Sequence, residues 1–402
     1  MLPELEGLRA VAALGIVTTH VAFQTAVGSP LLERFDFFVA VFFALSAFLL
    51  ARGRWRGGYF ARRFARIAPA YLVCVGVVLL TLPPLARVSL SQVVANVALV
   101  QVFVPGSLID GLTHLWSLSI ECTFYLVLPA YMALGQRGRW GALIAACVVG
   151  LLWPWVVWGR YDPDVLNLQI WPFSFAPWFA VGLVLAELER YGVRYAGPRW
   201  PFALVSLPVA WFAGVVGPAG LAHPTPREFN ARVILGALFA ALVVAPYALG
   251  PRFSGTWLAS APMRALGKWS YSIFLWHMAV LYWVFPVLGV PLFGGHFALV
   301  LLATLTASIA VAFISYELVE VPCARWLRAR IPARTSDGAS SRVGAEERDL
   351  ELGGVRGGVR ASGAERGGAG ASGAERDGAG ASGAERDGAG ASAGEGARLH
   401  AE

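Results

Sequence analysis

Residues 8–27 spell LRAVAALGIVTTHVAFQTAV, with one arginine and one histidine among apolar and small uncharged side chains. About 20 residues of this kind are enough to cross a hydrocarbon core of roughly 30 Å as a helix. Nine further segments have a similar character; they lie near 35–51, 67–86, 117–134, 140–158, 171–188, 200–217, 231–250, 268–288 and 296–318. The sequence therefore predicts an all-α integral membrane protein, a bundle of about ten transmembrane helices.

The composition supports this fold class and excludes others. The chain has 402 residues, of which 57% are hydrophobic and 14% charged, whereas soluble domains are roughly 45–50% apolar and about 25% charged. The formal net charge is +7, but the basic residues lie between apolar segments rather than in one polar domain. This distribution predicts a lipid bilayer as partner and argues against nucleic acid.

The basic residues also predict the orientation of the spans. With the N-terminus in the cytoplasm, 19 Lys and Arg residues lie in or near cytoplasmic connections and 5 in or near outer ones. Cytoplasmic loops of membrane proteins carry such an excess. We therefore expect both termini to be cytoplasmic and the protein to be a multi-pass protein of the plasma membrane.

The composition changes abruptly near residue 335. Gly, Ala, Ser, Glu, Arg and Asp then dominate, and the unit ASGAERGGAG at 361–370 recurs with one change at 371–380 and 381–390. Such a repeat cannot bury enough apolar surface to offset its ordering entropy. We predict a transmembrane domain over 1–334 and a disordered tail over 335–402.

Ionisable residues inside spans are costly and often functional. Arg9 and His20 are separated by three helical turns plus about 20°, so they share one helix face at depths roughly 16 Å apart. Asp36 and Glu121 are the carboxylates expected near the depth of His20, and Tyr125 lies one turn after Glu121. Either acid could orient His20 as a general base, and each could instead pair with an arginine.

Two other features have both structural and functional interpretations. His277 is a second intramembrane histidine, and the segment RGRWRGGYFARRFARIAPAY at 52–71 contains six arginines. The arginines could fix topology or contact anionic lipid, or they could bind the phosphates of a nucleotide-bearing donor. The four cysteines show no metal-ligand spacing, and we predict no metal site.

Six motifs in order resemble the acyltransferase 3 family of integral membrane O-acyltransferases. They are LEGLRAVAALGIVTTH at 5–20, FFALSAFLL at 42–50, RRFARIAPAY at 62–71, HLWSLSIECTFYLVLP at 114–129, YSIFLWH at 271–277 and SYELVEVP at 315–322. Two positions depart from the family pattern: Glu6 stands where aspartate is common, and Ala47 where glycine is usual.

The resemblance implies transfer of an acyl group, commonly acetyl from acetyl-CoA, to a hydroxyl of an exported glycan, a lipid-linked sugar or a small molecule such as a macrolide. It carries functional roles onto Arg9, His20, Glu121, Arg63 and Arg66. We expect no permanently bound cofactor and acyl-CoA as donor substrate, with Arg62 as a further phosphate ligand. Candidate acceptor-binding residues are Trp116, Ser119, Tyr125, Trp276 and His277.

Several alternatives remain open at this level. His20 could act as a general base or as a nucleophile that carries the acyl group, and Asp36 or Glu121 could be its catalytic partner. A rival function is a secondary transporter that uses His20, Asp36 and Glu121 as a proton relay. The acceptor, the acyl length and the oligomeric state do not follow from the sequence.

Overall fold

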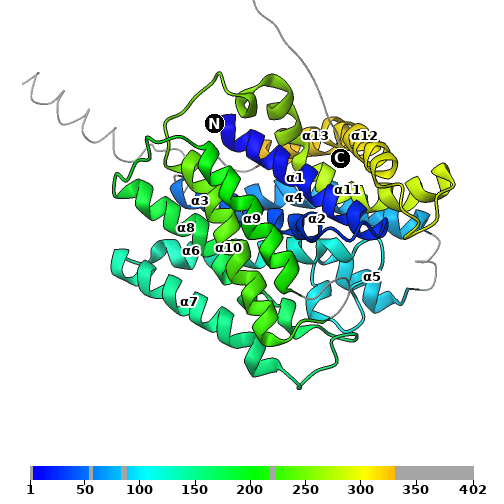
Figure 1. Cartoon of the computed structure of the whole chain (residues 1–402), viewed down its shortest axis with the longest axis horizontal. Helices are drawn as coiled ribbons and strands as arrows, with labels where there is room; N and C mark the ends of the chain where they lie inside the picture. The colour runs from blue at the N-terminus through cyan, green and yellow to red at the C-terminus, as the bar shows by residue number, and fades with distance from the viewer. Residues whose placement is uncertain (1–2, 54–57, 83–87, 218–222, 331–402) are drawn as a thin grey trace, which may run out of the picture. The chain divides into compact units, whose positions relative to one another are not determined.

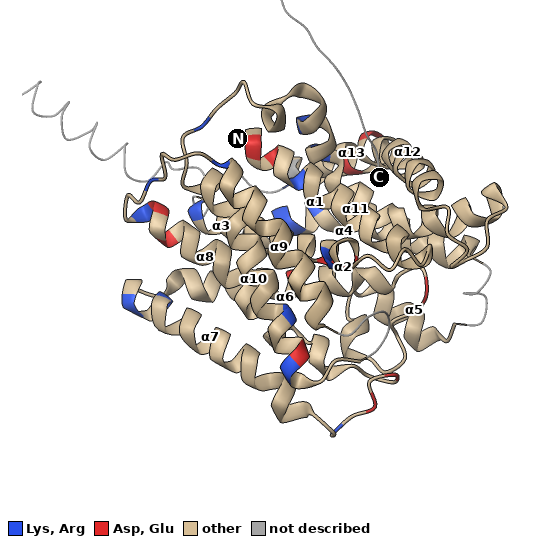
Figure 2. Ribbon diagram, in the orientation of Figure 1, with Lys and Arg blue, Asp and Glu red and all other residues tan. Residues whose placement is uncertain are grey.

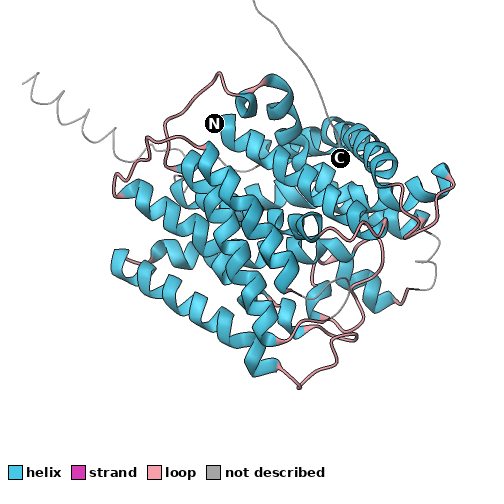
Figure 3. Ribbon diagram, viewed as in Figure 1, coloured by secondary structure: helices cyan, strands magenta, loops and turns pink. Residues whose placement is uncertain are grey.

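The computed structural model describes residues 3–53, 58–82, 88–217 and 223–330, and helices are the regular elements throughout these residues (Figure 3). The predicted tail, the domain boundary near 334 and two of the six clustered arginines, Arg54 and Arg56, lie outside the described residues.

Each of the ten predicted spans coincides with a helix (Figure 1). The ten are α1 (Pro3–Gln24), α3 (Phe38–Arg52), α4 (Tyr59–Thr81), α6 (Trp116–Ala133), α7 (Gln136–Val157), α8 (Ala176–Arg190), α9 (Trp200–Val216), α10 (Pro226–Ala248), α11 (Ala261–Leu288) and α12 (Phe297–Ser315). Three shorter α-helices are α2 (Pro30–Glu33), α5 (Leu90–Val97) and α13 (Val321–Ala329). Between α12 and α13 the chain forms a π-helical turn, Tyr316–Glu320.

Eight segments of the described chain are helical, long and apolar enough to cross a membrane. The other two predicted spans, α8 and α9, have 15 and 17 residues, whereas a span perpendicular to the bilayer needs about 20. The membrane character of the bundle is therefore confirmed, while the number of spans and their orientation stay predictions.

Helix α1 occupies the centre of the bundle. It packs against α11, α3 and α12, and 67% of its most apolar window is buried, the largest share among the eight candidate spans. The contact with α11 is close because α11 carries a glycine there. A Cβ at Gly267 would lie 2.1 Å from the Glu6 carbonyl oxygen. Gly7 allows an equally close approach of the turn Trp257–Ala259 that precedes α11, since a Cβ at Gly7 would lie 2.1 Å from the Leu258 carbonyl oxygen.

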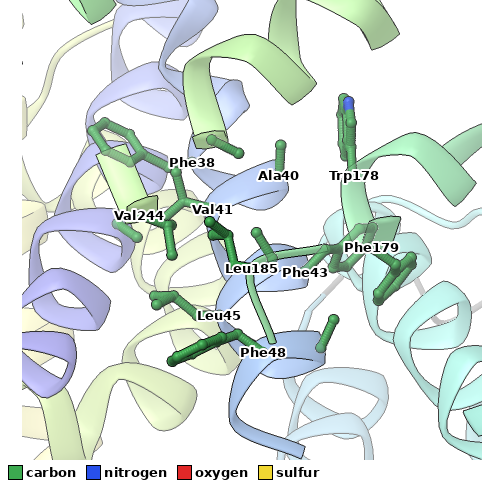
Figure 4. Close-up of a cluster of buried hydrophobic side chains, with 14 of the residues drawn as sticks. Phe38, Ala40, Val41, Phe43, Leu45, Phe48, Trp178, Phe179, Leu185 and Val244 are labelled. Atoms are coloured by element: carbon green, nitrogen blue, oxygen red, sulfur yellow. The ribbon is translucent and has the colours of Figure 1, made fainter. Parts of the chain in front are cut away.

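Aromatic side chains join α3, α8 and α10 in a hydrophobic core (Figure 4). The ring of Phe43 on α3 stacks on Phe179 of α8 with centroids 4.3 Å apart. Trp178, next along α8, donates from its indole nitrogen to the Val233 carbonyl of α10 at 2.8 Å. This aromatic core holds α3 and α10, which line one of the cavities described below, in fixed positions.

The structure explains why alanine is accommodated at position 47, where the family pattern usually has glycine. Ala47 is fully buried where α3 meets α8, and a Cβ on Gly182 of α8 would lie 2.8 Å from the Ala47 methyl group and 2.0 Å from the Ala44 carbonyl oxygen. The glycine that allows close approach therefore lies on the facing helix. The methyl group of Ala47 fills space that a glycine at 47 would leave open.

Most charged residues lie near helix ends or in connections (Figure 2). At the C-terminal end of α8, Glu189 forms a two-bond ion pair with Arg52 of α3, at 2.8 and 2.7 Å. Glu187 pairs in the same region with Arg139 of α7 at 2.8 Å. These pairs tie three helices together at one end of the bundle.

Replacing Gly182 by valine should destabilise the protein by about 1–3 kcal/mol, because the new side chain must displace the backbone of α3. Thermal unfolding in detergent measures this. Gly141→Ala on α7 is the matched control, since a Cβ there meets nothing within 4 Å. Equal melting temperatures for the two variants would contradict the close α3–α8 contact.

Candidate active site

Three arginines from two helices converge on a cavity of about 290 Å³ inside the bundle. Arg9 comes from α1, and Arg63 and Arg66 come from the first two turns of α4. Arg9 donates from Nε to the Ser270 hydroxyl of α11 at 3.3 Å. Among the described residues, the buried Nε of Arg63 has no hydrogen-bond partner. The cavity therefore presents guanidinium groups with unused capacity to bind an anion.

Glu121 is the carboxylate of this cavity. It accepts a hydrogen bond from the hydroxyl of Tyr125, one helical turn later on α6, at 2.5 Å. That hydroxyl is also 3.0 Å from the Ser46 hydroxyl of α3. Glu121 thus lies with the arginines, not with His20, and three guanidinium groups exceed its single negative charge.

A second cavity, of about 530 Å³, continues from the first at the N-terminal end of α1. Arg9 and Arg66 line both. The second adds Lys268 and Arg325 as cations and Glu6 and Glu320 as anions. The two cavities together form one predominantly cationic compartment along the first half of α1.

A third cavity, of about 260 Å³, lies along the second half of α1. The side chains with polar atoms in its lining are Thr19, His20, Asp36, His114, Trp116, Trp178 and Arg232. Its volume corresponds to about nine liquid waters at roughly 30 Å³ each, which suits one sugar-ring-sized unit. Three apolar side chains line both this cavity and the arginine cavity and therefore lie between them, namely Ile16, Val39 and Phe274.

His20 lies against two other histidines. Its ring centroid is 5.1 Å from that of His277 on α11 and 6.5 Å from that of His114, just before α6. Its Nδ1 is 3.4 Å from the Met278 sulfur. A thioether has no hydrogen to donate, so a hydrogen bond between these two atoms requires the proton on Nδ1 and leaves the lone pair on Nε2. In that tautomer His20 can accept a proton at Nε2.

Asp36 shares the cavity of His20 but is held by arginine. One of its oxygens, Oδ2, forms an ion pair with Arg232 of α10 and lies 3.7 Å from Nη1 of Arg34. The other, Oδ1, is buried without a partner in the described part of the chain. Neither Asp36 nor Glu121 forms a hydrogen bond with His20 in that same part. Asp36 therefore keeps one buried, unpartnered acceptor atom beside the cavity.

The remaining predicted residues are placed as follows. Arg62 lines neither arginine cavity. Ser119 is buried on α6 away from all three cavities. Trp276 lines an apolar groove between α4, α11 and α12 instead. Trp116 and His277 lie beside His20, and Tyr125 lies beside Glu121.

The structure adds His114, Met278 and Arg232 to the site, none of which the sequence analysis singled out. For His114 and Arg232 the usable signal is polarity within an otherwise apolar stretch. For Met278 the sequence carries no such signal. Within the described ranges, no group of three or more His, Cys, Asp or Glu residues is placed to hold a metal ion.

This arrangement can bind a polyanion at one end of α1 and accept a proton at the other. That chemistry can be compared with known proteins. The family described as acyltransferase domain matches residues 2–317. The chain belongs to the acyltransferase 3 family. Because the bundle has the length and apolarity to span a membrane, this member of the family is a multi-pass membrane O-acyltransferase.

Relatives of this acyltransferase include proteins of different lengths. It is 30% identical to the acyltransferase MdmB of Streptomyces mycarofaciens, over 83% of this chain and 95% of the relative. It is 26% identical to nodulation protein 10 of Rhizobium leguminosarum, over 81% and 94%. It is 24% identical to the peptidoglycan O-acetyltransferase OatA of Listeria monocytogenes, over 80% of this chain and 55% of that one. No solved structure matches it significantly.

Replacing Asp36 by asparagine should destabilise this acyltransferase by about 2 kcal/mol, because hydrogen bonds to charged groups contribute roughly 1.5–3 kcal/mol and the nearby Arg34 is buried. Asp164→Asn is the matched control. Asp164 pairs with His223 at 3.0 Å, but its side chain is 86% exposed, so its loss should change little. Denaturation in detergent compares the two, and equal stability would show that Asp36 has no structural role.

Proposed function

We propose that this enzyme moves an acyl group, most simply acetyl, from cytoplasmic acyl-CoA to a hydroxyl of an exported or envelope glycan, lipid-linked sugar or related metabolite. The observation that carries the proposal is the order in which the three cavities follow one another along α1. A cationic compartment adjoins a smaller cavity that contains His20, with three apolar side chains between them.

The donor fits the cationic compartment. CoA carries several phosphate charges, and Arg9, Arg63 and Arg66 supply guanidinium groups in excess of Glu121. With the predicted orientation, this compartment opens to the cytoplasm, where CoA thioesters are found. The pantetheine arm would then run along α1 and bring the thioester between Ile16, Val39 and Phe274, about 10 Å along the helix from Arg9 and one turn before His20.

The acceptor fits the cavity of His20. Trp116 offers an aromatic face there, and aromatic faces pack well against the apolar faces of sugar rings. The unpartnered Oδ1 of Asp36 can accept a hydrogen bond from a neighbouring hydroxyl of the same ring, and Arg232 beside it can donate. Relatives named as peptidoglycan O-acetyltransferases support a glycan acceptor.

The chemistry requires only a base in addition to this positioning. Nε2 of His20 takes the proton of the acceptor hydroxyl as its oxygen attacks the thioester carbonyl carbon. The new C–O bond forms and the C–S bond breaks. The protonated His20 then returns its proton to the CoA thiolate, so the enzyme ends in its starting state. A nucleophilic His20 would instead be acylated by donor alone, without any acceptor.

His20→Ala should reduce acyl transfer at least about 100-fold, since general-base catalysis contributes roughly 10²–10⁴-fold, while acyl-CoA affinity changes little. Transfer of radiolabelled acetyl from acetyl-CoA to envelope glycans, measured in membrane vesicles, provides the readout. His223→Ala is the control, because this exposed histidine pairs with exposed Asp164. A fully active His20→Ala enzyme would remove His20 from the mechanism.

Arg63→Gln/Arg66→Gln should weaken acyl-CoA binding by about 100-fold or more, because each charge-assisted contact contributes roughly 1.5–3 kcal/mol. Binding of labelled acetyl-CoA to protein in nanodiscs measures the change. Arg137→Gln/Arg194→Gln is the matched control, since it removes two exposed arginines that line none of the three cavities. Equal affinity in the two double variants would leave Arg63 and Arg66 as topology signals only.

A further inference from the structure

The general base proposed above lacks the partner that such bases usually have. A catalytic histidine becomes an imidazolium during the reaction, and a carboxylate often stabilises that cation. Here Asp36 is engaged by Arg232 and Arg34, and Glu121 accepts from Tyr125 in a different cavity. Within the described residues, the hydrogen bond of His20 goes to the Met278 sulfur, a weak acceptor. A buried imidazolium needs a stronger hydrogen-bond acceptor than a thioether sulfur, because burying an unpaired charge is costly.

The two neighbouring histidines are locked by backbone carbonyls into opposite tautomers. His277 donates from Nδ1 to the Phe274 carbonyl at 2.7 Å, so its Nε2 carries a lone pair. His114 donates from Nε2 to the Leu275 carbonyl at 3.3 Å, so its Nδ1 carries a lone pair. Carbonyl oxygens only accept, and this fixes both assignments.

Both of these lone pairs are buried and unused. His277 is 0% exposed and His114 is 4% exposed. In the described part of the chain, Nε2 of His277 and Nδ1 of His114 have no hydrogen-bond partner. Burying an acceptor without a donor costs about 1–3 kcal/mol. The fold therefore keeps two acceptor atoms beside His20 at an energetic cost.

The spacing suits a bond between the rings. When one imidazole nitrogen donates to another at about 3 Å, and each nitrogen lies roughly 1 Å from its ring centre, the centroids are about 5 Å apart. The centroids of His20 and His277 are 5.1 Å apart, and those of His277 and His114 are 4.8 Å apart. His20 and His114, at 6.5 Å, are too distant. His277 is thus the ring whose spacing from His20 allows such a bond to form once the ring of His20 turns toward it.

We propose that His277 is the positioning residue for the general base. When His20 takes the proton of the acceptor hydroxyl at Nε2, its Nδ1–H group turns away from the Met278 sulfur. It then donates its hydrogen bond to the lone pair on Nε2 of His277. No bond to hydrogen is broken in this exchange, and only the hydrogen-bond acceptor changes. Phe274 couples the site to the donor path, because its carbonyl holds His277 and its side chain lines both cavities.

This inference rests on the proposed function and is tested on the full-length enzyme in nanodiscs. His277→Leu removes the acceptor atom. It should lower kcat about 10- to 100-fold, the usual loss when the partner of a catalytic group is removed, with KM for acetyl-CoA within about twofold of wild type. His277→Gln places an amide oxygen near the position of Nε2 and should restore most of kcat. His277→Asn reaches only the position of Nδ1 and should not.

The controls separate the possible failures. His296→Asn changes an exposed histidine that bonds to Gly294 and should keep wild-type kcat. If His277→Leu does not fold, the comparison of the Gln and Asn variants decides. Equal kcat in those two variants, or wild-type kcat in His277→Leu, overturns the positioning role. Loss of transfer in His20→Ala together with an intact His277→Leu enzyme would leave the proposed function standing and remove this inference alone.

Discussion

The rest of this structure depends on the burial of α1, a helix that carries ionisable side chains within an apolar segment. Helix α1 carries Arg9 and His20 on one face, and neither can be exposed to hydrocarbon without a large cost. The bundle surrounds α1 with α3, α11 and α12. Gly267 lets α11 approach α1 to backbone contact, and Gly7 does the same for the turn that precedes α11. Because α1 is enclosed, the space left beside its polar face becomes a series of cavities instead of a lipid-facing surface.

The two halves of that series differ in how they handle charge. In the first half, guanidinium groups outnumber carboxylates, so the region favours an anionic ligand. In the second half, the charges of Asp36 and Arg232 are paired, and neutral histidine rings pack against one another. In the proposed mechanism, supporting His20 with an imidazole in place of a carboxylate avoids a further negative charge in a buried site. His20 would then be held only by the Met278 sulfur until it takes up the second proton.

Some of this arrangement follows directly from the sequence. The spacing of Arg9 and His20 places them on one face of any α-helix, and Glu121 and Tyr125 are one turn apart in any register. Both relations are local, and both are present in the structure. The membrane bundle likewise follows from segment length and apolarity.

Other relations could not be obtained in this way. Whether Glu121 faces Arg63 or His20 depends on how α6 is rotated. The polar residues of α6 are spread around the helix, so no single polar face fixes that rotation. The meeting of His20, His114 and His277 brings together three segments distant in sequence. It depends on close packing around glycines, which is set by the facing helix, as Ala47 and Gly182 show.

The three apolar side chains between the cavities also have an electrical consequence. A membrane enzyme whose cavities reach in from both sides risks becoming a leak, and each elementary charge crossing the membrane dissipates about 2.3 kcal/mol per 100 mV. Ile16, Val39 and Phe274 form a thin insulating layer across which most of the membrane potential would fall. A neutral thioester can pass between such side chains, whereas an unaccompanied ion cannot, so the acyl transfer proposed above would leave the membrane potential intact.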